Sequence, residues 1–300
     1  MNKIKTFFKN PWSIFRYLNH RGMLKMLSDK THVSVMYRSY IGKKLNLKNP
    51  QTYNEKLQWI KLNDRKSEYT RNADKLVVRE FIKNILGEEY LVKLNGVYDN
   101  AEDIEWDKLP EKFVLKCTHG SGTNIICKDK NKLDKSSAIK TMNGWLKTNA
   151  YWYGREWCYK DIKPKIICEE FIETPNGLPP KDYKFMCFNG YPKLIQVHDR
   201  RGLPDYSLTY YTPDWKKTDI KRIDASTTNI SFEKPGRLDE MLKIAETLAK
   251  NTFFARIDLY YENDHIYFGE ITYYPTSGFS TFDDEYTDEY LGSLLELPIK

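Results

Sequence analysis

The chain has 300 residues, of which 40% are hydrophobic and 14% aromatic, so it has enough apolar side chains for a large core and is not a disordered protein. No apolar run approaches the roughly 20 residues that span a bilayer, and the first residues lack the apolar region and cleavage site of a secretory signal, so we expect a cytoplasmic protein. The five cysteines include no Cys-x-x-Cys and are odd in number, which predicts reduced core residues rather than disulfides or zinc ligands.

Residues 1–68 are predicted to be a helical region, and its first part is strongly basic. Residues 1–50 carry eleven Lys or Arg and one acid, whereas residues 251–300 carry two basic residues and ten acids. One interpretation is a helix that lies on an anionic membrane, at the inner face of the cell membrane, or on a lipid-linked acidic glycan. The other is a helix that packs its aromatic side chains on the protein and leaves its lysines in water. The aromatic residues are Phe7, Phe8, Trp12, Phe15 and Tyr17.

Residues 73–86 are predicted to form a helix, because apolar side chains recur at helical spacing from 77 to 86 and Gly87 follows. Lys75 falls in the first turn, where the helix dipole disfavours a cation unless an anion lies nearby. Two interpretations of Lys75 follow: a cation that binds an anion, or a solvated lysine beside a capping Asp74.

A polar loop at 117–124 is predicted between strands at 113–116 and 125–127. Lys116 ends the first strand, glycines 120 and 122 let backbone N–H groups approach an anion, and Ser121 adds a hydroxyl donor. The pattern is typical of a phosphate-binding loop, and a purely structural hairpin would share it. Neither the P-loop spacing nor the Gly-x-Gly-x-x-Gly of dinucleotide-binding proteins occurs here.

Residues 166–173 are predicted to be a strand that leaves into a Pro/Gly-rich loop at 174–180 and re-enters a strand at 182–188. A strand that passes into a linker in this way can present backbone donors and acceptors to a nucleotide base.

Residues 256–272 are predicted to form a β-hairpin around the polar turn 262–265. If the loop has an odd number of residues, Asp258 lies directly across from Glu270, and alternation sends Ile257, Leu259 and Ile271 to the core. Opposed carboxylates repel, so this pair predicts a cation, and hard oxygen ligands suit Mg²⁺. The alternative is a pair of unpaired carboxylates on the polar face of an edge hairpin.

The order of these features resembles the ATP-grasp superfamily. More closely, several phrases between about residue 35 and residue 285 resemble the TupA-like ATP-grasp family of bacterial surface-polysaccharide gene clusters. The matching phrases are 54–59 (NEKLQW), 74–79 (DKLVVR), 113–122 (FVLKCTHGSG), 155–157 (REW), 182–185 (DYKF), 188–190 (FNG) and 256–258 (RID).

The resemblance implies an α+β protein of the ATP-grasp fold, in which two α+β lobes clamp ATP. The helical region 1–68 would precede a first lobe at 69–168, which holds the phosphate loop, and a second lobe at 169–300, which holds the adenine hinge and the metal-binding hairpin.

The resemblance also implies a role for each site residue, and the cofactors would be ATP and Mg²⁺. Lys75 and Lys116 would hold phosphates under a lid of His119, Gly120, Ser121 and Gly122, and the adenine hinge would be Glu169, Glu170, Phe171 and Ile172. Asp182 would face the ribose or the adjoining Lys184, and Asp258 and Glu270 would bind Mg²⁺. Arg256, Lys116 and His119 would be catalytic.

The chain departs from the superfamily at Thr272, because many ATP-grasp ligases carry Glu-x-Asn where this chain has Glu270-Ile-Thr. The third metal ligand is then a weaker hydroxyl or is missing. The expected substrate-binding residues are three arginines, which can clamp a carboxylate, and a turn with donors: Arg155, Arg200, Arg201, Ser277 and Gly278.

The expected function is an ATP-dependent carboxylate–amine ligase. It would join an amine or amino acid to a carboxylate, taken to be a uronic acid, of an acidic glycan or lipid-linked sugar precursor for the capsule or cell wall. The alternatives are a glycosyltransferase, for which the Asp-x-Asp motif is missing, a sugar kinase, and a non-catalytic ATP-binding module. No DNA- or RNA-binding module is recognisable, so no nucleic-acid partner is expected.

Overall fold

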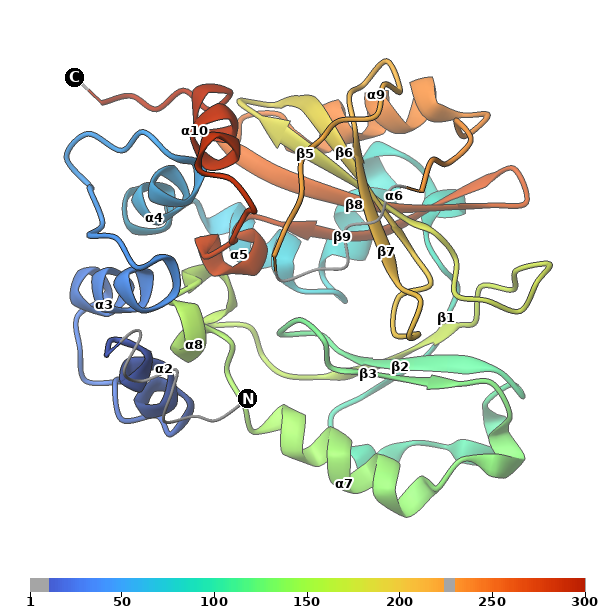
Figure 1. Cartoon of the computed structure of the whole chain (residues 1–300). Helices are drawn as coiled ribbons and strands as arrows, with labels where there is room; N and C mark the ends of the chain where they lie inside the picture. The colour runs from blue at the N-terminus through green and yellow to red at the C-terminus, as the bar shows by residue number, and fades with distance from the viewer. Residues whose placement is uncertain (1–10, 224–229, 300) are drawn as a thin grey trace.

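The computed structural model describes residues 11–223 and 230–299. Two antiparallel sheets dominate it, as Figure 1 shows. The smaller sheet has the strand order β1-β4-β2-β3, and the larger has the order β7-β6-β5-β8-β9. The strands are β1 (Leu94–Tyr98), β2 (Phe113–Cys117), β3 (Asn124–Cys127), β4 (Ile166–Glu170), β5 (Asp182–Phe188), β6 (Tyr191–Asp199), β7 (Ser207–Tyr211), β8 (Phe254–Glu262) and β9 (His265–Thr272).

Helices surround the two sheets at one end and on their outer faces. The α-helices are α2 (Ser13–His20), α3 (Asp29–Ile41), α4 (Tyr53–Asn63), α5 (Ser67–Ala73), α6 (Val78–Ile85), α7 (Lys135–Leu146), α8 (Tyr151–Gly154), α9 (Leu238–Ala249) and α10 (Glu285–Ser293). Short 3₁₀ turns are η1 (Glu88–Tyr90), η2 (Ala101–Asp103), η3 (Trp106–Lys108), η4 (Lys130–Lys132), η5 (Trp157–Tyr159) and η6 (Pro275–Gly278). None of the helices in the described part of the chain has the length and apolar character to cross a bilayer.

The larger sheet has one apolar and one polar face, because its side chains alternate along each strand. Phe185 and Ile257 are fully buried on the apolar face, together with residues of α9. The buried positions of α9 follow helical spacing, and they include Leu238, Met241 and Ala245. The opposite face carries the predicted site residues of β5, β8 and β9.

The hairpin of β8 and β9 has the predicted cross-strand pair, in which Asp258 is the partner of Glu270. The odd number of loop residues that this pairing assumed does not occur, because Asn263 and Asp264 form a two-residue turn with φ of 51° and 58°. A bulge after Asp258 adds one residue on β9, Gly269, and restores the register. Glycine is required there because a Cβ would lie 2.9 Å from the carbonyl oxygen of Asp258.

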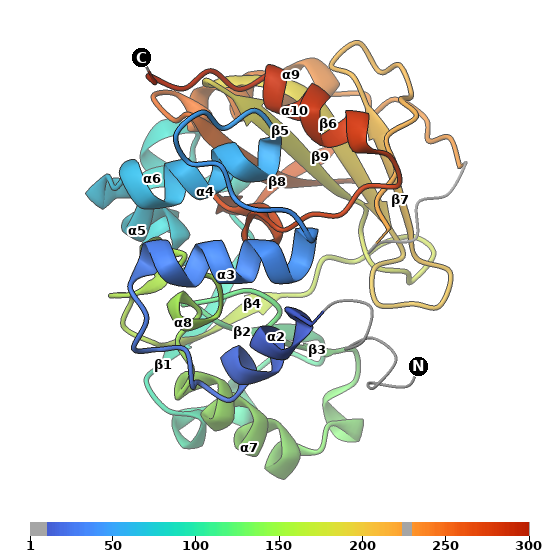
Figure 2. The same ribbon diagram turned by 60° about the vertical axis from the view of Figure 1, so that its left-hand side comes forward.

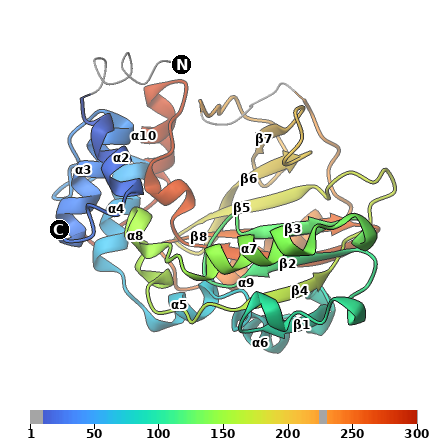
Figure 3. The same cartoon turned by 90° about the horizontal axis from the view of Figure 1, so that it is seen from below.

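The smaller sheet forms its own core with α7, which covers its outer face (Figure 3). Phe113 and Leu115 of β2 are fully buried in this core, as is Met142 of α7. All five residues of β4 belong to the smaller sheet. The predicted lobe boundary between 168 and 169 therefore cuts β4, and the first sheet ends at Glu170 instead.

The helices before residue 86 divide between two cores. Tyr69 of α5 and Ile82 of α6 are buried with the larger sheet, although the predicted division assigned them to the first lobe. Met36 and Tyr37 of α3 form a separate small cluster with Phe279. Figure 2 shows α3 lying beside α4 and α2, at the end of the molecule where α10 also packs.

Candidate functional site

A row of charged residues crosses the polar face of the larger sheet. Lys184 of β5 is the cross-strand partner of Asp258 on β8, which is in turn the partner of Glu270 on β9. Arg256 and Thr272, each two residues away from this pair on the same two strands, are also cross-strand partners. The sheet register therefore brings together residues that are up to 88 positions apart in the chain.

Arg256 binds both hairpin carboxylates. Its Nε and Nη2 atoms each donate to Asp258 at 2.7 Å, and Nη2 also donates to Glu270 at 3.3 Å and to the Thr272 hydroxyl at 3.1 Å. Burial disfavours the charge of Arg256, but the nearby carboxylates raise its pKa above the ordinary value, so it stays charged. The alternative of unpaired surface carboxylates is wrong for Asp258, which is buried and paired.

Lys184 and Lys75 each bind one of the two hairpin carboxylates. The ammonium of Lys184 pairs with Asp258 and lies 2.7 Å from Asp182. Lys75 lies 3.4 Å from Glu270 and donates to the carbonyl oxygen of Gly120 at 2.5 Å. Lys75 thus stands between the larger sheet and the glycine loop of the smaller one.

The predicted place of Lys75 in the first turn of a helix is wrong, because α6 starts at Val78. Asp74 ends α5, and its carboxylate accepts hydrogen bonds from the N–H groups of Leu76 and Val77 at 2.8 and 3.2 Å. These bonds fix the turn that directs Lys75 toward Glu270 rather than into solvent.

The cluster carries more positive than negative charge. Four cations surround three carboxylates, since Arg201 also lies 3.3 Å from Asp182. Burial alone raises the pKa of Glu270, but Lys75, Lys184 and Arg256 together hold it well below its ordinary value. Such a site favours an anionic ligand, and a polyphosphate would meet the excess charge.

The donors fit Mg²⁺ if it arrives with such an anion. Asp258, Glu270 and the Thr272 hydroxyl offer hard oxygens of the kind Mg²⁺ prefers. Each carboxylate oxygen of the pair, however, already contacts a cationic side chain, and the described residues contain no group of three or more His, Cys, Asp or Glu placed to hold a metal. A bare cation would therefore be opposed by the excess positive charge, whereas an anion-bound cation would not.

A second charged group lies on the smaller sheet. Lys116 of β2 lies 2.5 Å from Glu169 of β4, and Arg79 lies 3.0 Å from the other oxygen of that carboxylate. Two predicted site residues, Lys116 and Glu169, thus form an ion pair with each other, and sequence reasoning missed Arg79 as the second partner of Glu169. Of the rest of the predicted hinge, Glu170 is exposed at the end of β4, and Phe171 and Ile172 are half-buried after it.

The glycine loop lies as predicted between β2 and β3, but its residues differ in exposure. Gly120 is buried beside Lys75, whereas Ser121 and Gly122 are exposed, and Gly122 has a φ of 73°. His119 is 3% exposed, and its Nε2 lies 3.1 Å from the carbonyl oxygen of Trp145 on α7. Burial lowers the pKa of His119, and its contact with Trp145 holds the ring against α7.

The structure does not support Arg155 as a substrate clamp. Its side chain is 1% exposed, and Nη2 donates at 3.0 Å to the carbonyl oxygens of Leu24, Lys25 and Leu27. Arg155 has a φ of 57°, so the backbone turns sharply at this point. Its role is to hold the turn after α2.

The other two predicted arginines lie in the turn that joins β6 to β7. Arg200 pairs with Asp205 and is 43% exposed, away from the charged row. Arg201 is 60% exposed and reaches Asp182 of the row. Only Arg201 of the three arginines therefore contacts the cluster.

The predicted turn of Ser277 and Gly278 is held by a buried network that sequence reasoning missed. Lys61 of α4 is fully buried, and its ammonium donates to the carbonyl oxygens of Ser277 and Gly154 at 2.8 Å and to Gln58 at 2.9 Å. The Ser277 hydroxyl donates to Glu156 at 2.5 Å. Burial lowers the pKa of Lys61 to about 8.

The turn itself is conformationally strained. Thr276, Ser277 and Gly278 have φ values of 50°, 57° and 67°, and positive φ is unfavourable for the first two. The only signal of this network in the sequence is the polar spacing of Asn54, Gln58 and Lys61 along one helix, which also suits an exposed helix face.

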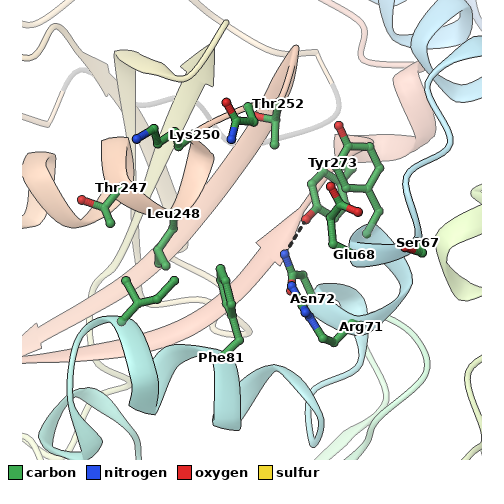
Figure 4. Close-up of a pocket in the computed structure, with 13 residues that line it drawn as sticks. Ser67, Glu68, Arg71, Asn72, Phe81, Thr247, Leu248, Lys250, Thr252 and Tyr273 are labelled. Carbon is green, nitrogen blue, oxygen red and sulfur yellow. Dashed lines mark hydrogen bonds between the residues drawn. The ribbon is translucent and has the colours of Figure 1, made fainter.

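A separate cavity of about 530 Å³ opens behind the hairpin, between α5, α6 and the end of α9 (Figure 4). Asn72 points across it to the hydroxyl of Tyr273, at 3.1 Å. Phe81 and Leu248 give the cavity an apolar wall. None of its lining residues belongs to the charged row, so the cavity and the candidate site are distinct.

The comparisons with known proteins agree with the sequence pattern. The model of the family described as "TupA-like ATPgrasp" matches residues 55–296. A search among curated proteins found no match.

The search of solved structures found matches at low similarity. D-alanine–D-alanine ligase from Bacillus anthracis, complexed with ATP, is 15% identical with a TM-score of 0.42, and the alignment covers 67% of this chain and 55% of that one. The corresponding ligase from Helicobacter pylori is 16% identical with a TM-score of 0.43, covering 81% and 69%. A RimK domain ATP-grasp protein from Sphaerobacter thermophilus is 8% identical with a TM-score of 0.42, covering 77% and 68%. The chain thus spans little more than half the length of the Bacillus enzyme.

Proposed function

Because the chain belongs to the TupA-like ATP-grasp family, we propose that it is an ATP-dependent carboxylate–amine ligase that acts through an acyl phosphate. The observation that supports this most directly is the charged row of the larger sheet, where four cations surround three carboxylates and Lys75 reaches the glycine loop of the other sheet. Such an arrangement suits a polyphosphate held between the two sheets.

The proposed reaction has two steps, and both balance. An oxygen of the substrate carboxylate attacks the γ-phosphorus of ATP, the bond to the bridging oxygen breaks, and ADP leaves. The amine then attacks the acyl carbon, phosphate leaves with the bonding electrons, and the amine nitrogen loses a proton, which gives an amide. Positioning and charge neutralisation supply most of the rate of phosphoryl transfer.

The residues of the row have distinct parts in this proposal. Lys75 and Lys184 bind the transferring phosphate and its neighbour, and Arg256 neutralises the charge that develops on the equatorial oxygens. Asp258 and Glu270 would hold Mg²⁺, which would supply neutralisation of the negative charge on the phosphates. Lys116 would move from Glu169 toward the phosphates when the two sheets close on the nucleotide.

We propose that the carboxylate belongs to a uronic acid of a capsule or cell-wall precursor and that the amine is an amino acid or related compound. The support is the resemblance described above, which implies surface-polysaccharide biosynthesis, and Arg201, which is exposed beside the row and can bind an acidic sugar. Since the reaction consumes ATP, we place it in the cytoplasm.

An isotope experiment tests the proposal. The purified protein is incubated with ATP, Mg²⁺, amino acids and uronic acid oligosaccharides whose carboxylates carry ¹⁸O. The expected result is ADP, an amide product, and one ¹⁸O in each released phosphate, because the acyl phosphate transfers a carboxylate oxygen to phosphorus. Phosphorylated sugar without amide would indicate a kinase, and ATP binding without ADP would indicate a non-catalytic module.

The non-catalytic alternative has one observation in its favour. Thr272 stands where many ligases carry asparagine, and its hydroxyl is bonded to Arg256 and Glu270 at 3.1 and 3.3 Å. Thr272→Asn separates the two cases: in a ligase it maintains or raises ADP formation, whereas in a binding module it leaves turnover at zero.

A further inference from the structure

Exposed apolar side chains gather on α2 and the turn that follows it. Met26 is 97% exposed, Met23 65%, Tyr17 53% and Ile14 39%, and Tyr153 of α8 is 49% exposed next to them. Contact between the ring of Tyr153 and that of His20, at 6.2 Å between centroids, joins the two elements. We call Ile14, Tyr17, Met23, Met26 and Tyr153 the N-terminal patch. Clustered exposed apolar groups of this kind mark an interaction surface.

The charged side chains of α2 and the turn that follows it are basic. No acid occurs between residues 11 and 28, whereas Arg16, Arg21 and Lys25 do. These cations lie over aromatic rings, with Arg21 5.4 Å from the centroid of Tyr17 and Lys25 5.5 Å from that of Trp152. Within residues 11–223 and 230–299, neither Arg21 nor Lys25 forms an ion pair with a carboxylate, so their charge faces outward uncompensated.

The fold prevents the N-terminal patch from turning inward. Leu24, which lies between the two methionines in the chain, is buried, and Arg155 donates to the carbonyl oxygens of Leu24 and Lys25 at 3.0 Å. Asn19 donates to the carbonyl oxygen of Tyr153 at 2.8 Å, and Nε2 of His32 lies 2.8 Å from its side-chain oxygen. Inward-facing Phe15 packs on the cluster around Met36, so the two sides of α2 differ sharply.

We propose that the N-terminal patch docks on an anionic phospholipid membrane. Basic side chains beside a small set of apolar and tyrosine side chains match the headgroup and upper acyl region of such a bilayer. The predicted membrane segment 1–50 is thereby reduced to α2 and its turn, while residues 1–10 lie outside the described residues. This docking is independent of the proposed ligase activity.

Residues 154–156 connect the N-terminal patch to the turn at Ser277. Gly154 and Glu156, the neighbours of Arg155, contact Lys61 and Ser277 of the buried network. The membrane-facing turn is therefore held by a segment that also touches the loop beside the charged row. Under the proposed function, docking through this patch would hold the protein at the membrane that carries a lipid-linked substrate.

Vesicle flotation of the full chain tests the proposal without nucleotide. The vesicles are phosphatidylcholine alone, or the same lipid with one third phosphatidylglycerol. We expect binding to the anionic vesicles at low salt, about tenfold weaker binding to the neutral ones, and loss of binding at high salt. Absence of binding to the anionic vesicles would overturn the proposal.

Two variants locate the surface. Met23→Gln/Met26→Gln removes apolar contact without adding charge and should weaken binding about tenfold. The matched control is Ile126→Gln/Tyr286→Gln, which changes two side chains that are 51% and 81% exposed elsewhere, and should bind like the parent. Equal binding of the two double variants would contradict the proposal. A single-stranded RNA that binds the protein more tightly than the vesicles do, and displaces it from them, would also contradict it. Since all four positions are exposed, equal thermal unfolding temperatures will show that both variants are folded.

Discussion

Lys75 joins the two sheets of the molecule through a single ammonium group, which lies 2.5 Å from the carbonyl oxygen of Gly120 and 3.4 Å from the carboxylate of Glu270. One contact is on the loop of the smaller sheet and the other is on the last strand of the larger sheet. A nucleotide between the sheets would replace the carbonyl contact by a phosphate contact.

The first prediction concerns this lysine. Lys75→Met should raise the Kd for Mg-ATP about tenfold or more, because a charge-assisted hydrogen bond contributes roughly 1.5–3 kcal/mol. Isothermal titration calorimetry measures the affinity, and Lys132→Met, whose side chain is 84% exposed, is the control. Equal affinities in the two variants would remove Lys75 from the proposed site.

The second prediction concerns the hairpin carboxylates. Glu270→Gln should raise the Mg²⁺ concentration that gives half-maximal ADP formation by about tenfold, because a neutral amide is a much weaker ligand than a carboxylate. Glu262→Gln, near the turn of the same hairpin, is the control and should behave like the parent. An unchanged Mg²⁺ requirement in Glu270→Gln would place the metal elsewhere.

The third prediction concerns the bulge that sets the register of Asp258 and Glu270. Gly269→Ala places a methyl group 2.9 Å from the Asp258 carbonyl oxygen, so it should lower the free energy of unfolding by about 1–3 kcal/mol. It should also weaken Mg-ATP binding, because the carboxylates separate. Urea unfolding and calorimetry measure the two effects.

Gly144 of α7 is the control for this substitution, since a Cβ there meets nothing within 4 Å. Gly144→Ala should stabilise the protein by about 0.5–1 kcal/mol through helix propensity. If Gly269→Ala behaved in the same way, the bulge would not be needed for the register.

The fourth prediction concerns pH. Burial, with the charges of Arg155 and Lys61, lowers the pKa of His32 from 6.5 to about 4. Between these values the unfolded chain binds more protons than the folded one, so this contribution to stability is complete above pH 6.5 and is lost as the pH falls toward 4. His32 should therefore account for a loss of about 2 kcal/mol between neutral pH and about pH 5.

Urea unfolding at the two pH values tests this. His32→Gln should be less stable at neutral pH but should lose less stability on acidification than the parent. His265→Gln changes a half-exposed histidine of the hairpin and should retain the parent's pH dependence. A parent-like loss of stability in His32→Gln would assign the pH dependence to other groups.

Local pattern was enough to predict much of the larger sheet. The alternation of polar and apolar residues along 256–272 predicted that Asp258 faces Glu270 and that the apolar side chains are buried. Both features depend only on residues close together in the chain. The two-residue turn shifts the pairing by one residue from that of an odd loop, and the bulge at Gly269 shifts it back, so the predicted pair is found although neither feature was predicted. The alternation of apolar and polar residues does not reveal a one-residue bulge, because the only sequence requirement at the bulge is a glycine.

Contacts between distant segments were the part that could not be predicted. The pairing of Lys75 with Glu270 spans 195 positions, and the pattern around each residue is the same with or without the other. Arg155 is the clearest case, because nothing near it in sequence indicates that its partners are the carbonyl groups of residues 24–27. Every residue carries a backbone carbonyl group, so no sequence motif shows which carbonyls an arginine will bind.

The partners of α4 lie at the far end of the chain. Lys56 donates to the carbonyl oxygens of Gly292 and Leu295 at 2.9 and 2.6 Å, and Asn54 exchanges two hydrogen bonds of 2.9 Å with Ser280. A ribosome synthesises α4 long before these partners, so Asn54 and Lys56 lack them until residues 280–295 have been made. The hydrogen bonds of Lys56 can therefore form only after α10 has been synthesised, and a premature stop before α10 would leave this buried end of α4 without its carbonyl partners.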